Sequence, residues 1–92
     1  MRASARHILV EDEALCQTLK EQINAGEKSF EEVAKEHSLC PSKAQGGDLG
    51  RFGQGQMVPE FDQVVFHDEV GVVHGPVQTQ FGYHLLEITE RS

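Results

Sequence analysis

The stretch that decides the fold is GGDLGRFGQGQM, residues 46–57. Five of its twelve residues are glycine, and it ends on Met57. Glycine-rich stretches of this length cradle phosphates, link domains flexibly, or form ordered loops with unusual backbone angles. The residues between and after the glycines distinguish these three uses.

Two of the three uses do not fit this stretch. A phosphate-binding P-loop needs a lysine after its last glycine, and the stretch contains none. The dinucleotide fingerprint G-x-G-x-x-G begins at position 53 but fails at position 58, which is valine. A flexible linker would lack large apolar residues such as Leu49, Phe52 and Met57. The stretch is therefore an ordered loop, whose apolar residues either cap the core, as the local pattern favours, or wall a pocket.

The composition is that of a small soluble domain: 92 residues, 38% hydrophobic and 25% charged. The net charge of −7 argues against a nucleic-acid or anionic membrane partner, because both attract Lys and Arg. The apolar run near the N-terminus is too short for a signal peptide, so a cytoplasmic location is expected if Met1 is the natural start. Cys16 and Cys40 lack the C-x-x-C spacing, and we expect reduced thiols.

Hydrophobic periodicity predicts three helices. Asp12 caps the first, which carries Leu15, Leu19 and Ile23 on its apolar face and stops at Gly26. The second spans 29–37 and starts with a capping box. The third begins with proline at position 59, and a short helical turn is expected after position 41.

Short runs of β-forming residues predict four strands. They lie at 5–10, 49–52, 75–79 and 83–89, with a surface loop at 67–75 and a turn at Phe81–Gly82. One sheet packed by helices in an α+β domain follows from this order.

Two histidines lie inside predicted strands. Because side chains alternate along a strand, His84 shares a face with Leu86 and Ile88, so its surroundings are mostly apolar. A lone histidine of this kind is usually a satisfied core residue. If the first and last strands pair, however, His7 and His84 can meet and hydrogen-bond, and Thr79 on the preceding strand could donate to one of them.

Cys40 has three interpretations. It could be a nucleophile activated by His7 or His84, a zinc ligand with them, or a polar wall of a pocket. A hydrolase usually needs more scaffold than this chain offers, and no paired ligands at short spacing indicate zinc. The third interpretation is therefore favoured.

Four segments together resemble the parvulin-type peptidyl-prolyl cis/trans isomerases, most of all the small free-standing bacterial ones. They are HILV (7–10), CPS (40–42), GGDLGRFGQGQMVPEFDQVVF (46–66) and GPVQTQFGYHLLEI (75–88). The resemblance covers about residues 5–90 and implies a single domain over 1–92. It also implies an α+β fold with a four-stranded antiparallel sheet and about four helices, in the order βα3βαβ2.

The resemblance also implies a substrate site. Leu49 and Met57 would form the rim of a proline pocket, Phe61 its floor, and Phe81 a further lining position. Phe52 is a weaker candidate, since it could face the core instead. The polar cluster beneath the pocket would be His7, Cys40, Thr79 and His84. Many family members carry aspartate at the position of Cys40, which is hard to reconcile with an obligatory nucleophile.

The implied activity is rotation about Xaa-Pro bonds in peptides and in unfolded or nascent proteins. No bond breaks, so no metal or cofactor is expected. Phospho-dependent parvulins carry a basic cluster after the first strand, whereas this chain has Glu11, Asp12 and Glu13. We therefore expect an apolar or neutral residue before proline, no phosphate preference, and a monomer. The alternatives are a parvulin-fold chaperone module with little catalysis and a hydrolase built on Cys40.

Overall fold

The two central strands of the sheet come from opposite ends of the chain. In the computed structural model, which describes residues 1–92, β1 (Arg2–Val10) pairs antiparallel with β4 (Gly82–Arg91). The strand β2 (Asp48–Gly53) adds to the other edge of β1, and β3 (Val73–Thr79) adds to β4. The resulting order β2-β1-β4-β3 confirms the predicted four-stranded antiparallel sheet.

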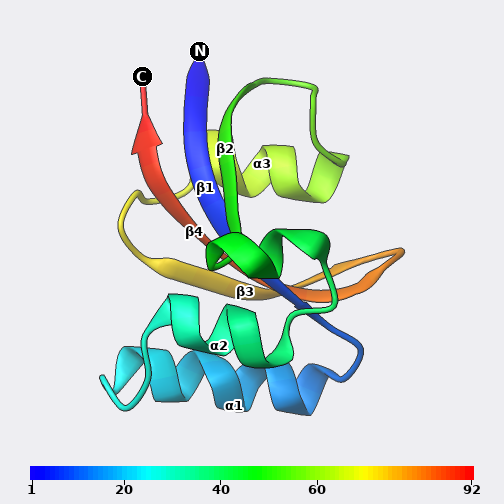
Figure 1. Ribbon diagram of the computed structural model, residues 1–92. Coiled ribbons are helices and arrows are strands. Elements are labelled where there is room, and N and C mark those ends of the chain that lie inside the picture. The colour runs from blue at the N-terminus through cyan, green and yellow to red at the C-terminus, as the bar shows by residue number, and fades with distance from the viewer.

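Alternation along β1 gives the sheet two buried faces. Ile8 and Val10 belong to one hydrophobic cluster, whereas Ala3 and Ala5 belong to another. The helices α1 (Glu13–Asn24) and α2 (Phe30–His37) cover the first face, and α3 (Pro59–His67) covers the second. Figure 1 shows α1 and α2 side by side on one side of the sheet and α3 on the other.

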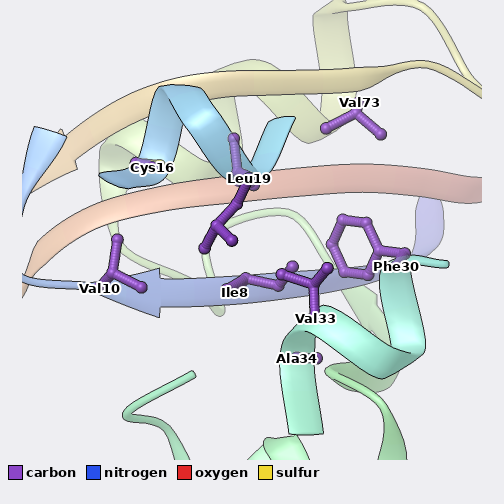
Figure 2. Close-up of a cluster of buried hydrophobic side chains, with 9 residues drawn as sticks. Ile8, Val10, Cys16, Leu19, Phe30, Val33, Ala34 and Val73 are labelled. Atoms are coloured by element: carbon purple, nitrogen blue, oxygen red, sulfur yellow. The ribbon is translucent and has the colours of Figure 1, made fainter. Parts of the chain in front are cut away.

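The first core fills the space between β1 and the helix pair. Figure 2 shows Leu19 of α1 and Phe30 and Val33 of α2 gathered around Ile8. Both predicted helix starts are confirmed: the Asp12 carboxylate accepts from the Ala14 amide, and Ser29 forms a capping box with Glu32. These caps satisfy amide groups that a helix start leaves unpaired.

The register of α1 differs from the prediction. Cys16 and Leu19 are buried, whereas Leu15 is 36% exposed. The apolar face of α1 is therefore set by Cys16, Leu19 and the partly buried Ile23. Leu15 lies at the edge of this face, close to the end of β1.

The predicted loop at 67–75 is wrong at its C-terminal end. Val73 is buried and pairs with Glu87, so β3 begins there and not at Gly75. Because Thr79 pairs with Gly82, the turn is centred on Gln80–Phe81, one residue earlier than predicted.

The expected helical turn after position 41 is the 3-10 helix η1 (Pro41–Gln45), which gives three α-helices and one 3-10 turn. None of the helices has the length and apolarity that a membrane span requires.

One glycine of the stretch at 46–57 fixes the loop against the sheet. The His7 amide donates to the Gly47 carbonyl at 2.9 Å, and Gly47 has a φ of +88°. A Cβ at Gly47 would collide with the His7 carbonyl oxygen. Only glycine allows this approach, which brings η1 and the start of β2 next to His7.

Candidate active site

The site is built on two histidines that face each other from neighbouring strands. His7 and His84 are 5% and 4% exposed, and a hydrogen bond of 3.3 Å joins their Nδ1 atoms. Their rings stack with centroids 5.4 Å apart. The predicted meeting of the two imidazoles is confirmed.

Two hydroxyl groups complete a line of hydrogen bonds. His84 Nε2 lies 2.7 Å from Thr79 Oγ1, and His7 Nε2 lies 3.1 Å from Ser42 Oγ. The Phe81 amide donates to Thr79 Oγ1 at 3.1 Å. All four ring nitrogens therefore have a partner, and we call the line from Ser42 through both histidines to Thr79 the hydrogen-bond chain.

The geometry of the hydrogen-bond chain requires that at least one of the two imidazoles is neutral. The contact between two Nδ1 atoms has room for one proton, so one ring donates and the other accepts. Burial first, and the nearby His84 second, lower the pKa of His7 to about 4. Burial also lowers the pKa of His84 to about 4, against the opposite influence of Glu60. Both rings are thus neutral near pH 7.

An aromatic ring connects the histidine pair to the surface. Phe61 packs edge-on against both imidazoles, with centroids 5.3 Å from His7 and 4.6 Å from His84. Above it lies a pocket of about 410 Å³, large enough for a proline and its neighbours. The pocket is lined by His7, Leu9, Leu39, Cys40, Pro41, Leu49, Met57, Val58, Phe61, Phe81 and His84.

Most of the residues predicted for the substrate site line this pocket. Leu49 and Met57 from the glycine-rich stretch lie on its wall, with Phe61 buried at its base. Phe81 stands at the rim and is 59% exposed. Their contact with substrate stays a prediction.

Phe52 was predicted as a weaker substrate-binding candidate, and the structure places it elsewhere. It is buried in the second core, where its ring packs edge-on against Phe66 at 6.1 Å. It therefore supports the wall of the pocket from inside. Thr79 also lies outside the pocket: it contacts His84 from behind and lines a separate hollow with Glu60.

Cys40 lines the pocket, but its surroundings do not activate it as a nucleophile. A cysteine nucleophile needs a base within hydrogen-bond reach. The ring nitrogens of His7 and His84 are already bound to each other, Ser42 and Thr79. The chain also contains no group of three or more His, Cys, Asp or Glu side chains placed to hold a metal ion.

Ser42 is the polar residue of the site that sequence reasoning missed. It closes the hydrogen-bond chain at His7, and its signal was its position in the CPS motif, two residues after Cys40. Apolar lining residues were missed as well. Leu9 could have been found, because it lies two residues after His7 in β1 and therefore shares its face. The other missed residues, Leu39, Pro41 and Val58, lie in segments without periodicity.

Comparisons with known proteins agree with this geometry. The family model of the rotamase PPIC-type PPIase domain matches residues 7–90. The foldase protein PrsA of Halalkalibacterium halodurans is 44% identical over 92 residues, which cover 99% of this chain and 27% of that protein. The crystal structure of PrsA from Bacillus anthracis superposes with a TM-score of 0.91 at 42% identity, covering 96% of this chain and 41% of that one.

A shorter protein matches along nearly its whole length. Pin from the archaeon Cenarcheaum symbiosum has a TM-score of 0.85 at 36% identity, covering 97% of this chain and 92% of that one. The curated PrsA relatives are longer, and the chain spans between 27% and 32% of their length. The chain belongs to the PPIC-type peptidyl-prolyl cis/trans isomerase family, the parvulins.

Proposed function

We propose that this domain accelerates rotation about unmodified Xaa-Pro bonds in peptides and unfolded proteins, without a covalent intermediate or a cofactor. The observation that carries the proposal is the apolar pocket above a neutral and fully paired hydrogen-bond chain. Such a site can hold a proline ring and offers no activated nucleophile.

The chemistry of rotation fits this inventory. Turning a peptide bond costs ~18–20 kcal/mol because the amide loses its resonance. The cis and trans forms of Xaa-Pro bonds differ by only about 0.5–1 kcal/mol, so a catalyst has to stabilise only the twisted state. A pocket walled by Leu49, Met57 and Phe61 would bury the pyrrolidine ring and remove water from the neighbouring carbonyl.

The histidines act as positioning residues in this proposal. Phe61 rests on both imidazoles, so the hydrogen-bond chain holds the floor of the pocket rigid. Cys40 lies on the wall and tunes the local field near the substrate carbonyl. No proton transfer is required of either histidine.

The residues after β1 support action on unphosphorylated substrates. Glu11, Asp12 and Glu13 are exposed where β1 passes into α1, and a second cavity lined by Glu11 and Asp12 adjoins the proline pocket. A phosphate group bound there would be repelled by these carboxylates. The substrate residue before proline is therefore unmodified.

NMR exchange spectroscopy on Ala-Xaa-Pro-Phe peptides tests the proposal. With Xaa as leucine, glutamate or phosphoserine, we expect catalytic amounts of protein to speed exchange most for leucine and least for phosphoserine. Met57→Ala should lower kcat/KM about tenfold by opening the pocket, whereas Met57→Leu keeps its volume and most of the activity. Fastest exchange for phosphoserine would overturn the role given to Glu11 and its neighbours.

One observation favours chaperone binding as a second candidate. Leu39 and Phe81 are 57% and 59% exposed at the pocket rim, where they offer apolar surface to an unfolded chain. The PrsA relatives are named foldases. Peptide-induced shifts at these residues without faster exchange would favour binding over catalysis. The monomeric state and the cytoplasmic location remain predictions, which light scattering and cell fractionation would check.

A further inference from the structure

A second cavity adjoins the proline pocket. It has a volume of about 350 Å³ and lies where β1 ends and α1 begins. Leu39 lines both cavities, so they are neighbours with a shared wall. We call the second cavity the acidic hollow; it is lined by Val10, Glu11, Asp12, Leu15, His37 and Leu39.

Leu39, which the two cavities share, is fixed to β1. The Leu39 amide donates to the Leu9 carbonyl at 2.8 Å. The buried Ser38 hydroxyl accepts from the Leu9 amide at 3.1 Å and from the Cys40 amide at 3.4 Å. A peptide with its proline in the pocket would thus have a flanking residue beside the acidic hollow.

The acidic hollow combines an apolar base with a negative rim. Val10, Leu15 and Leu39 supply aliphatic surface, and the last two are exposed. The Glu11 carboxylate forms no hydrogen bond or ion pair, and one oxygen of Asp12 remains free after its bond to the Ala14 amide at 3.1 Å. His37 is the one basic side chain of the lining.

Lysine and arginine are the side chains that match this combination. Their long aliphatic stems pack on apolar surface while the cationic head stays in water or meets a carboxylate. A leucine would use only the apolar base, and a glutamate would be repelled by the rim. The helical pattern predicts Leu15 in the core, but its exposed side chain is free to form part of the apolar base of the hollow.

We propose that the acidic hollow binds the side chain of a lysine or arginine that flanks the proline of the substrate. The proposal rests on the proposed isomerase function and specifies its substrate class. It goes beyond the sequence-based expectation of an apolar or neutral neighbour, because the carboxylates that exclude phosphate also attract a cation.

Citrulline provides the test, since it is a neutral side chain with almost the shape of arginine. We would measure kcat/KM for peptide pairs with arginine or citrulline placed directly before or directly after the proline. Arginine should be favoured about two- to fivefold in one of the two positions, as exposed charge pairs permit. The preference should vanish in about 1 M salt, where charges are screened beyond about 3 Å. Equal kcat/KM for both pairs at low salt would overturn the proposal.

Charge-neutralising variants distinguish an arginine preference that comes from the acidic hollow from one that comes from the net negative charge of the chain. Glu11→Gln and Asp12→Asn should each reduce the preference for arginine, and asparagine retains the helix cap. Glu27→Gln is the matched control, because this exposed residue follows the far end of α1, about 18 Å away. An equal reduction in all three variants would assign the preference to the overall charge and contradict the hollow.

A failure of catalysis can be told apart from a failure of this site. If no peptide is isomerised, the proposed function fails, but amide shifts on titration still report binding. Shifts at Glu11–Leu15 and Leu39 with the arginine peptide, and not with its citrulline partner, would support the hollow without catalysis. Shifts confined to the proline pocket for both peptides would overturn it.

Discussion

At the scale of single residues, the site is defined by how its polar atoms are paired. The four ring nitrogens of His7 and His84 are bound within the hydrogen-bond chain. Cys40 lines the same pocket as the two histidines, but none of their ring nitrogens is free to act as its base. The arrangement therefore supports a rigid floor for a binding pocket better than it supports covalent chemistry.

Replacing the thiol tests this distinction. We expect Cys40→Ala and Cys40→Ser to retain kcat/KM within about tenfold of the unmodified protein, because no covalent step is lost. Removal of a true nucleophile costs at least about ten-thousandfold. NMR exchange on the leucine peptide gives the rates. A loss greater than about a thousandfold in both variants would restore the nucleophile hypothesis for Cys40.

A thiol-alkylating reagent gives an independent check on Cys40. Burial raises the pKa of Cys16 to about 11, and its side chain is inaccessible, so labelling of the folded protein reports on Cys40 alone. Alkylation should slow isomerisation by filling the pocket. The unlabelled protein should show no burst of acyl-enzyme when an ester substrate is offered, whereas a burst would indicate that Cys40 acts as a nucleophile.

The polar pairing explains which residues could be predicted from the sequence. His7 and His84 were predictable because alternation gives each an apolar face, and the pairing of the first and last strands brings the two rings together. Phe52 and Leu49 are both apolar residues of the same short strand, and only packing against Phe66 of α3 sends one to the core and the other to the pocket. Ser42 had no periodic signal, since η1 is too short to have one.

At the scale of elements, the contact of η1 and β2 with β1 depends on Gly47. Its positive φ and its distance to the His7 backbone leave no room for a side chain. The same contact brings Ser42 within hydrogen-bond distance of His7 and Leu49 into the lining of the same pocket. The glycine-rich stretch is thus an ordered loop that walls a pocket, and the interpretation that it merely caps the core holds only for Phe52.

Two alanine substitutions separate the energetic cost of a positive φ from the cost of a collision between the added Cβ and a neighbouring backbone atom. Gly47→Ala should lower the free energy of unfolding by about 3 kcal/mol or more, because strain and a backbone collision add. Gly55→Ala is the control: its φ of +83° is similar, but no atom lies within 4 Å of the added Cβ. It should cost only about 1–2 kcal/mol. Urea unfolding measures the free energy of unfolding of both variants. Equal losses would show that the backbone around Gly47 shifts at no cost to accommodate the added Cβ.

Element boundaries were less predictable than element types. The sequence predicts a strand that begins at Gly75, because a β-forming run is recognisable only from the Gly75–Pro76 pair onward, although pairing with β4 already starts at Val73. In α1 the spacing of Leu15, Leu19 and Ile23 fits a helix face, but the buried face is shifted toward Cys16. In both cases the sheet decides the outcome, and its contacts join residues far apart in the sequence.

At the scale of the whole molecule, the sheet connects the site to both ends of the chain. Arg2 and Ser92 exchange two backbone hydrogen bonds of 2.9 Å, so the termini lie side by side, as Figure 1 shows. The histidine pair lies on the same two strands, β1 and β4. Any change that charges the pair therefore acts on the centre of the fold as well as on the pocket.

This coupling predicts that mild acid destabilises the whole domain. The pKa of each of the two histidines is about 4 in the folded protein, below the ordinary value of about 6.5 expected after unfolding. The stability that the neutral pair contributes is therefore fully present above about pH 6.5 and is lost as the pH falls toward about 4. Between these values the unfolded chain binds protons that the folded chain excludes. The free energy of unfolding should decrease by up to about 1.4 kcal/mol per pH unit for each histidine.

Urea unfolding between about pH 7 and about pH 5 measures this slope, because ordinary carboxylates stay ionised over that range. His84→Gln removes one titrating group and should make the slope shallower. His67→Gln removes an exposed histidine at the end of α3 and should leave it nearly unchanged. If His84→Gln and the unmodified protein lost stability in parallel, the histidine pair would not be the source of the acid sensitivity. In that case proton uptake elsewhere would cause the loss of stability, and the histidine pair would not couple the pocket to the stability of the fold.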